Sequence, residues 1–422
     1  MIWSGLVGNY KKEKISDFLR NKSVTNISVF DDYFLEKLCS DYIHPITLEN
    51  PKVELVKKVQ ELYLDIMNEE LQRTPVTFPI TTACFSIDED NNIQDLEFLK
   101  MIAGKNKKFG FINIYIGKTS TLSSCCRLRS EQNNEYFNSF GSGSSKIGSL
   151  GVVSINLPRL AYKNKNNIEE FKKQLGLIVT ICAKINNAKR HIIKRRIDNG
   201  NQPLYQNEFI NINTQYSTVG VNGFNEAIEI MGCDILTQKG IDLGLEIIDV
   251  INKNNEKNQL QYKAPHNAEQ VPGENMSFKL VEKDKLLGFN NKYEIYSNQF
   301  IPLTTKADLL DRIKIQGIFD RYFSGGSICH LNIEESINDS KLIEDLILEC
   351  AKRGIIYFAI NYNLQRCSNK HMTVGRKDKC PICNADIEDN YCRVVGFLTN
   401  TKNWHKTRRE IDYPNRVWYK DI

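Results

Sequence analysis

Three groups in this 422-residue sequence have the residue types and spacing that chemistry requires: a glycine, a pair of adjacent cysteines, and a cluster of cysteines with a histidine. The glycine is Gly396, inside the apolar stretch Tyr391–Leu398 near the C-terminus. A lone glycine usually marks a turn or a bulge, because it has no Cβ and adopts positive φ freely. The missing Cβ also lets its Cα lose a hydrogen atom and become planar, with the unpaired electron delocalised over both flanking amides.

The adjacent cysteines are Cys125 and Cys126, followed by Arg127. Free cysteines are most often small buried hydrophobes. These two come after a predicted strand at 111–116 and before a polar segment rich in Gly and Ser, where α/β folds place reacting groups. A cysteine thiyl radical can abstract a ribose hydrogen because the S–H and C–H bonds have similar strength. Adjacent side chains on extended backbone point to opposite sides, so we expect one of the two thiols to face a reaction site.

The cluster contains Cys367 and His371, followed by Cys380-Pro-Ile-Cys383. Two thiolates separated by two residues can reach one tetrahedral Zn²⁺ ion. This spacing favours a metal site over unmetallated surface thiols. The start of the sequence does not resemble a signal peptide, and no apolar run is long enough for a membrane span. We therefore expect a cytoplasmic protein whose 12 cysteines are kept reduced.

The elements that must position these groups read as an α/β fold. Strands predicted near 78–87, 111–116, 151–158, 293–303 and 355–360 alternate with helices that include 168–196 and 223–252. This alternation predicts parallel strands joined by right-handed crossovers, and a closed α/β barrel suits this length, with an open sheet as the alternative. The net charge of +5 suits a polyphosphate substrate but does not indicate a nucleic-acid-binding protein.

Several stretches, taken in order, resemble the class III, anaerobic ribonucleotide reductases. The match spans about residues 75–422. The matching stretches are Leu122–Leu128, Gly148–Arg159, Tyr216–Glu226, Glu269–Asn275, Tyr296–Pro302, Gly325–Asn332, Tyr357–Tyr362 and Arg393–Leu398. The resemblance implies a ribonucleotide-reductase-like α/β barrel with a C-terminal zinc ribbon. It also implies the anaerobic reduction of ribonucleoside triphosphates to 2′-deoxyribonucleoside triphosphates, which supplies DNA replication.

The same resemblance implies roles for individual residues. Gly396 would store a glycyl radical, and Cys126 would become the thiyl, because the radical-bearing cysteine of the family directly precedes an Arg. Cys125 is a candidate second thiol of the site. An activase, an iron–sulfur protein that cleaves S-adenosylmethionine, would generate the radical.

The family also has a structural four-cysteine zinc site, from which this sequence departs. The second cysteine of the first pair is missing, so the expected ligands are Cys367, Cys380 and Cys383 with His371 as the replacement. Cys392 is the rival fourth ligand. A zinc ion here would act as a structural staple for the glycyl-radical loop.

Four regions are expected: an N-terminal helical segment at 1–74, the barrel with its thiyl finger loop at 75–362, the zinc ribbon at 363–392, and the glycyl-radical loop and tail at 393–422. Family members usually begin with an ATP-binding cone and the first half of the barrel, which have no match here. We therefore expect an N-terminally short catalytic part, either in the homodimer that the family implies or with a partner chain. The alternatives are an inactive or split-gene fragment, and a glycyl-radical lyase or dehydratase.

Single residues suggest further roles. Ser149 stands where formate-using relatives tend to carry Asn, which favours a dithiol protein over formate as the reductant. Arg127 and Lys146 are candidate phosphate contacts, and helix N-termini suit the same phosphates. Glu274 and His330 are candidate acid/base groups. Cys329 reads as a core residue rather than a site thiol.

Overall fold

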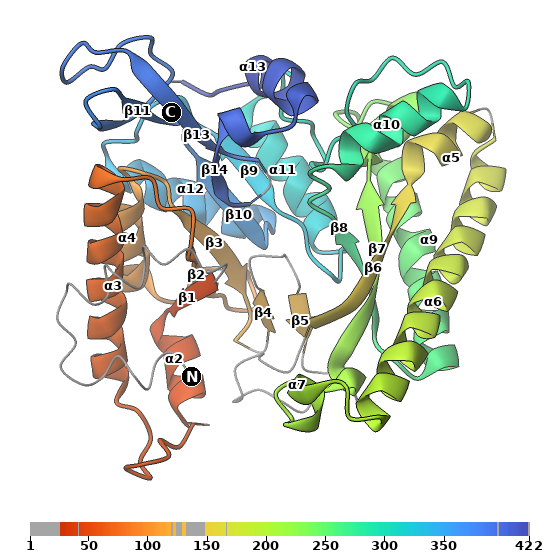
Figure 1. Ribbon diagram of the computed structural model, residues 1–422, viewed down its shortest axis with the longest axis horizontal. Coiled ribbons are helices and arrows are strands. Elements are labelled where there is room, and N and C mark those ends of the chain that lie inside the picture. Colours follow the sequence, from red (N-terminus) through yellow and green to blue (C-terminus); the bar gives the residue numbers. More distant parts are fainter. Residues whose placement is uncertain are drawn as a thin grey trace.

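The computed structural model describes residues 26–40, 42–119, 121–123, 129–131, 148–165, 167–394 and 396–420. Its strands form two larger sheets with helices on their outer faces, and a smaller sheet near the C-terminus (Figure 1). The expected α/β class is therefore confirmed. Among the described residues, no helix has the length and apolar character needed to cross a membrane.

The first large sheet has five strands in the order β1-β2-β3-β10-β9. Its strands are β1 (Asn26–Phe30), β2 (Ile80–Ser86), β3 (Ile112–Gly117), β9 (Cys329–Asn332) and β10 (Tyr357–Asn361). β1, β2 and β3 run parallel, and β10 pairs antiparallel with β3 and parallel with β9. The two halves of this sheet therefore run in opposite directions. β2, β3 and β10 are buried along their whole length, as near-continuous apolar runs predict.

The second large sheet is parallel and has the order β6-β7-β8. Its strands are β6 (Gly148–Asn156), β7 (Gln215–Asn222) and β8 (His266–Gln270). Its outer face is covered by the long helices α6 (Ile168–Asp198) and α9 (Gln238–Tyr262), on the right of Figure 1. The two large sheets face each other around the middle of the molecule. Within the described ranges no backbone pairing joins β8 to β9 or β6 to β1, so these pairs do not close a barrel.

The remaining helices cover the outer faces and ends of these sheets. They are α2 (Asp32–Ser40), α3 (Val53–Arg73), α4 (Leu96–Asn106), α5 (Leu157–Lys163), α7 (Pro203–Gln206), α8 (Phe224–Ile230), α10 (Met276–Leu286), α11 (Leu309–Asp320) and α12 (Ser340–Arg353). A short 3₁₀ turn, η2 (Ile212–Thr214), precedes β7. α3, α4 and α12 pack against the outward face of the first sheet, where Ile112 and Ile114 are fully buried. Asn113 and Tyr115 alternate with these residues and therefore point to the opposite, inner face.

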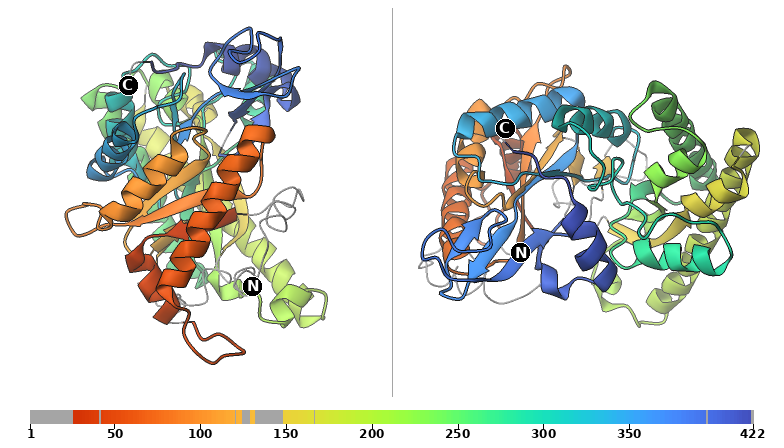
Figure 2. Two further views of the ribbon diagram at one scale, coloured as in Figure 1. Left: turned by 90° about the vertical axis from the view of Figure 1, so that its left-hand side faces the viewer. Right: turned by 90° about the horizontal axis from the view of Figure 1, so that it is seen from above.

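The C-terminal part forms a four-stranded antiparallel sheet with the order β12-β11-β13-β14. Its strands are β11 (Leu364–Cys367), β12 (Met372–Val374), β13 (Ile387–Arg393) and β14 (Leu398–Asn400). The chain continues through η3 (Thr401–Asn403), the π-helical turn η4 (Arg408–Asp412) and α13 (Tyr413–Asn415). Seen from above, this last segment lies between the two halves of the molecule (Figure 2, right).

Three details differ from the sequence-based expectations. The strand expected at 293–303 is wrong, because this segment is irregular and Ser297 and Asn298 make side-chain and backbone bonds to Glu226 and Pro272. The helix expected at 223–252 is two helices, α8 and α9, separated by a turn in which Gly232 has a φ of +82°. β1 lies in the segment expected to be helical and pairs along its length with β2.

Candidate active site and metal site

Gly396 lies in the loop between β13 and β14, two strands that pair antiparallel and bring the ends of the loop together. Its φ is +147°, a conformation that an L side chain rarely adopts. The residue is buried. The backbone at this position therefore suits glycine for a conformational reason as well as for the chemistry expected of it.

Gly396 contacts the inner face of the five-stranded sheet. The Asn113 side-chain amide donates hydrogen bonds to the Gly396 carbonyl oxygen (3.3 Å) and to the Tyr357 hydroxyl (3.1 Å). Tyr357 is also hydrogen-bonded to the Thr82 hydroxyl at 3.0 Å. All three side chains are buried, so the loop approaches the strands in an environment where water does not compete for these bonds.

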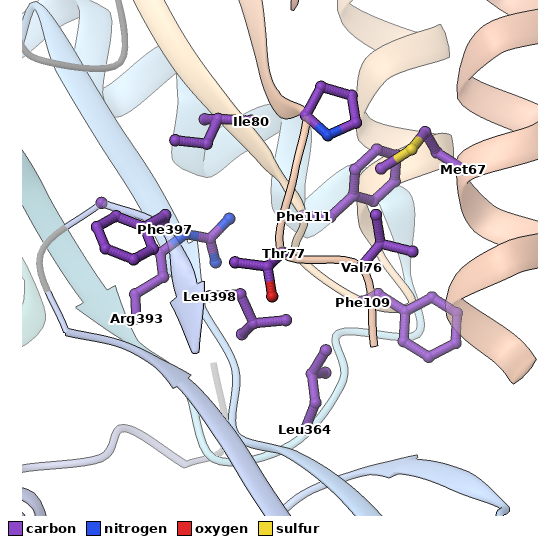
Figure 3. A pocket seen from close by; sticks show the side chains of 12 residues that line it. Met67, Val76, Thr77, Ile80, Phe109, Phe111, Leu364, Arg393, Phe397 and Leu398 are labelled. Atoms are coloured by element: carbon purple, nitrogen blue, oxygen red, sulfur yellow. The ribbon is translucent and has the colours of Figure 1, made fainter. Parts of the chain in front are cut away.

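A pocket borders the other side of the same loop (Figure 3). Arg393 and Phe397 lie on one side of it, and Met67, Phe109 and Phe111 lie on the other. The lining is mostly apolar. Arg393 is the exception among these five residues: it donates to the Ile360 carbonyl at 3.1 Å, and burial lowers the pKa of its guanidinium to about 10.

The C-terminal tail holds the Gly396 loop to the second half of the molecule. Asp412 accepts hydrogen bonds from Arg408 (3.1 Å) and Arg416 (2.8 Å), and all three are buried. Arg416 also donates to the Arg393 carbonyl at 2.8 Å, three residues before Gly396. Arg408 donates to the Glu274 carbonyl at 3.0 Å, in the segment that follows β8. We call Arg408, Asp412 and Arg416 the tail clamp.

Breaking the tail clamp should release the tail. Burial raises the pKa of the Asp412 carboxyl, but Arg416 and Arg408 outweigh this effect, so the net shift is downward. Replacing Asp412 by Ala leaves two buried cations without their partner, which costs about 3–5 kcal/mol for a buried pair. We expect faster hydrogen exchange and proteolysis of residues 401–420. The exposed carboxylate of Glu410, replaced in the same way, should change neither measurement.

The clamp should also weaken in acid. A folded-state pKa below the unfolded value of about 3.9 means that the stabilisation is complete above that pH and is lost as the pH falls through the folded-state value. An Asp412→Ala chain that exchanged its tail amides no faster than the wild type would show that the clamp does not hold the tail.

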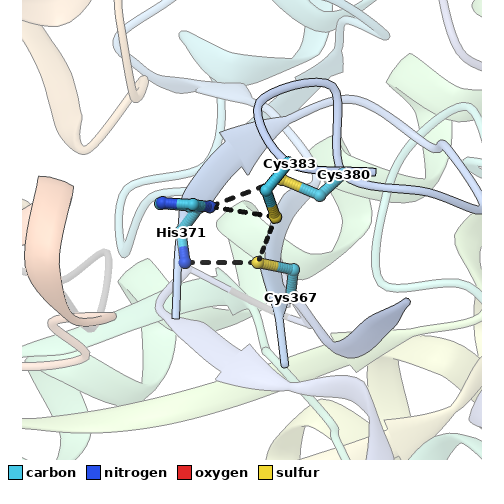
Figure 4. A group of neighbouring side chains, drawn as sticks. All are labelled: Cys367, His371, Cys380 and Cys383. Atoms are coloured by element: carbon cyan, nitrogen blue, oxygen red, sulfur yellow. Dashed lines mark hydrogen bonds between the residues drawn. The ribbon is translucent and has the colours of Figure 1, made fainter. Parts of the chain in front are cut away.

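Cys367, His371, Cys380 and Cys383 form a compact cluster in the C-terminal sheet (Figure 4). Their ligand atoms all lie within 4.8 Å of one another. The Sγ atoms of Cys367 and Cys383 are 3.8 Å apart, and the His371 Nδ1 atom lies 3.2 Å from the Cys383 Sγ. Two sulfurs bound tetrahedrally at the usual Zn–S length of about 2.3 Å are separated by roughly 3.8 Å. The residues therefore fit a Zn²⁺ ion with three thiolates and one imidazole.

The local structure also favours a thiolate at Cys383. The backbone N–H of Ala385 and the side chain of Asn369 donate to its sulfur and lower the pKa of the thiol to about 6. Cys392, the rival fourth ligand, is not part of the cluster. Its sulfur lies 3.6 Å from the Arg416 Nη1 atom and 3.6 Å from the Asn361 Oδ1 atom.

Cys125 and Cys126, with Arg127 and Lys146, lie outside the described residues. The segments on either side of the cysteines form β4 (Thr121–Ser123) and β5 (Arg129–Glu131), which pair antiparallel. β4 and β5 lie between the two halves of the molecule (Figure 1). The assignment of the thiyl radical to Cys126 therefore stays a prediction.

The other residues singled out in the sequence have mostly structural contacts. Cys329 packs in the outward core, as expected, and burial raises the pKa of its thiol to about 12. The Ser149 hydroxyl bonds to the Thr218 hydroxyl at 3.0 Å. Glu274 contributes its backbone carbonyl to Arg408. His330 is fully buried on β9, and its backbone N–H donates to Gln299.

Sequence reasoning missed Asn113, Tyr357 and the tail clamp. A signal existed for Asn113, because an amide within the apolar run 111–116 is unusual and calls for a partner. The clamp residues give no such signal. Their spacing of four residues is common in surface helices.

Three comparisons identify relatives. A family model described as "Anaerobic ribonucleoside-triphosphate reductase" matches residues 41–419. A solved structure described as "Anaerobic ribonucleotide reductase" is 30% identical, covers 97% of this chain and 68% of its own, and superimposes with a TM-score of 0.86. The anaerobic ribonucleotide reductase from Thermotoga maritima with glycerol in the active site is 30% identical, with 96% of this chain and 69% of the other covered and a TM-score of 0.83.

A curated relative is more distant. The anaerobic ribonucleoside-triphosphate reductase of Haemophilus influenzae is 20% identical over 283 residues, which cover 59% of this chain and 39% of that protein. The chain thus matches well under half of the length of this curated relative. The family model, in contrast, covers nearly all of the described residues. The chain therefore belongs to the family of anaerobic ribonucleoside-triphosphate reductases.

Proposed function

We propose that this chain reduces ribonucleoside triphosphates to 2′-deoxyribonucleoside triphosphates by glycyl and thiyl radical chemistry. The observation that carries the proposal is the position of Gly396: a buried glycine with positive φ, in a loop held against the inner face of the five-stranded sheet. Gly396 is buried there, which shields it from bulk water. Membership of the family supplies the reaction class.

The proposed sequence begins with the activase, which removes one hydrogen atom from the Gly396 Cα and leaves an unpaired electron. When substrate is bound, the Cys126 thiol returns a hydrogen atom to this Cα and becomes a thiyl radical. The thiyl abstracts a ribose hydrogen, which prepares the sugar to lose its 2′-hydroxyl group as water. The dithiol reductant is oxidised to a disulfide and supplies two electrons and two protons, which account for the new C2′–H bond and the water that leaves. Cys126 then returns its hydrogen atom to the ribose, and the thiyl radical left behind takes a hydrogen atom from the Gly396 Cα, which restores the glycyl radical.

The residues around Gly396 have supporting roles in this sequence. Asn113 and Tyr357 hold the loop on the inner side, and Arg416 holds the carbonyl of Arg393 just before it. A zinc ion bound by Cys367, His371, Cys380 and Cys383 would supply structural stabilisation, not redox chemistry. We propose that residues 363–392 are a zinc ribbon whose strands fix the position of the loop and tail at 393–422.

The proposed partners follow from the reaction. We infer an iron–sulfur activase that uses S-adenosylmethionine, and a dithiol protein as reductant, since Ser149 stands where formate-using relatives tend to carry Asn. The Thermotoga maritima relative has been solved in complex with dATP and CTP, which supports nucleotides as substrate and effector classes. A homodimer is proposed, with a complex with a different partner chain as the alternative.

The reaction is tested by anaerobic reconstitution. The chain is incubated with an activase, S-adenosylmethionine, a dithiol reductant and each ribonucleoside triphosphate, and deoxynucleotides are separated by chromatography. We expect deoxynucleotide formation that requires the activase. A chain that forms the glycyl radical but acts only on non-nucleotide substrates would instead be a lyase or dehydratase, and the proposal would be wrong.

The metal assignment makes a separate prediction. The wild-type chain should contain one zinc ion, and Cys380→Ser should lose it, because three ligands bind zinc far more weakly than four. His371→Cys should retain the ion and Cys392→Ser should also retain it, since Cys392 contacts Arg416 instead. Elemental analysis after dialysis measures the content. Loss of zinc in Cys392→Ser with retention in His371→Ala would contradict the ligand set.

A further inference from the structure

Asn113 is a buried amide next to Gly396 on the inner face of the five-stranded sheet. It is 1% exposed, on the inner face of β3, and its register neighbours are Thr82 on β2 and Ala359 on β10. Both neighbours are small. These small side chains leave room for the backbone of Gly396 to approach the sheet. The Asn113 side chain spans the remaining distance from β3 to the Gly396 carbonyl oxygen.

The hydrogen bonds of Asn113 use its amide nitrogen fully. One hydrogen goes to the Gly396 carbonyl oxygen and the other to the Tyr357 hydroxyl. The Tyr357 hydroxyl, which accepts this bond, pairs in turn with Thr82. The bond from Asn113 to the Tyr357 hydroxyl fixes the direction in which the amide nitrogen points. That direction is towards the carbonyl of Gly396.

The Asn113 oxygen, by contrast, has no hydrogen-bond partner among the described residues. A buried unpaired acceptor costs folding free energy, which the two bonds donated by the amide nitrogen must offset. The amide at this position is therefore better explained by what its nitrogen does. One of the two groups that accept its bonds is the carbonyl of the proposed radical residue.

We propose that Asn113 is a positioning residue for the glycyl radical, acting through a hydrogen bond to the Gly396 carbonyl. This inference rests on the proposed function. A glycyl radical is planar and shares its unpaired electron with both flanking amides. A donor on the Gly396 carbonyl stabilises the form in which electron density moves onto that oxygen, and it holds the peptide plane in one orientation. Asn113 thus controls both the spin distribution of the radical and the direction of its Cα.

The test is pulsed electron paramagnetic resonance of the activated full-length chain. Wild-type protein labelled with ¹⁵N in the asparagine side chains should show a weak ¹⁵N coupling to the glycyl radical. The Asn113→Leu variant should not show this coupling, and the hyperfine splitting from the Gly396 Cα hydrogen should differ from that of the wild type. Its radical should decay roughly fivefold faster, the factor that corresponds to about one hydrogen bond. Thr82→Val is the matched control, since Thr82 contacts Tyr357 and not Gly396. It should retain the ¹⁵N coupling.

The outcomes separate this inference from the function on which it rests. A wild-type glycyl radical without ¹⁵N coupling would overturn the role of Asn113, even where Asn113→Leu forms no radical. An unchanged spectrum in Asn113→Leu would do the same. The complete lack of a glycyl radical in activated wild-type protein would instead count against the proposed function.

Discussion

Gly396→Ala protein, treated anaerobically with the activase and S-adenosylmethionine, will give no glycyl radical signal and will form no deoxynucleotide. Two physical effects act together. Alanine at this position would have to adopt a φ of +147°, a backbone conformation that costs a non-glycine residue on the order of 1–3 kcal/mol. The methyl group would also crowd the planar centre that removal of the Cα hydrogen creates.

The control for strain is Gly375→Ala. Gly375 also has a positive φ, +127°, in the same C-terminal part, and an added Cβ would meet no atom closer than 3.7 Å. The backbone cost is of the same kind, but no radical chemistry is assigned to this residue. We expect Gly375→Ala to retain the signal. A normal glycyl radical in Gly396→Ala would remove the basis of the account.

Cys126→Ser should separate storage of the radical from its use. The activase acts on Gly396, so this variant should show the glycyl signal at wild-type amplitude. Serine cannot relay the radical, because its O–H bond is much stronger than an S–H bond. Deoxynucleotide formation should fall by at least about 10⁴-fold, as it does when a residue essential to the chemical step is removed. Substrate should no longer change the radical signal.

Cys125→Ser is the matched control for this experiment. Adjacent side chains on extended backbone point to opposite sides, so only one of the two thiols should face the ribose. We expect Cys125→Ser to keep activity within about tenfold of the wild type. Activity in Cys126→Ser together with its loss in Cys125→Ser would move the thiyl to Cys125. Full activity in both variants would refute a thiyl on this loop.

Much of the fold could be predicted because its elements are long and periodic. The helix expected at 168–196 is α6 (Ile168–Asp198), and the strand expected at 111–116 is β3 (Ile112–Gly117). β1 was missed because a five-residue edge strand is stabilised by its neighbour β2 and carries little pattern of its own. The strand prediction at 293–303 was wrong for a different reason. The composition of this segment favours a strand, but Ser297 and Asn298 form hydrogen bonds to Glu226 and Pro272 instead of pairing with another strand.

The candidate site likewise contains a part that local sequence predicts and a part that depends on long-range contacts. The grouping of Cys367, His371, Cys380 and Cys383 could be predicted, because Cys380 and Cys383 are close in sequence and belong to one turn. The contact between Asn113 and Gly396 joins residues that are 283 positions apart, and the topology of the sheet creates it. No local pattern contains such a contact. The partners of Gly396 therefore became visible only once β3, β10 and the loop were placed together.

The account depends most directly on where the unpaired electron resides. The decisive measurement is the electron paramagnetic resonance spectrum of the activated wild-type chain labelled with [2-¹³C]glycine, recorded on a sample that is then tested for deoxynucleotide formation. We predict a doublet from one Cα hydrogen, split further by ¹³C, that is absent from Gly396→Ala, together with product. Deoxynucleotide formation by a sample with no glycine-centred radical, or a radical spectrum unaffected by the ¹³C label, would contradict the account.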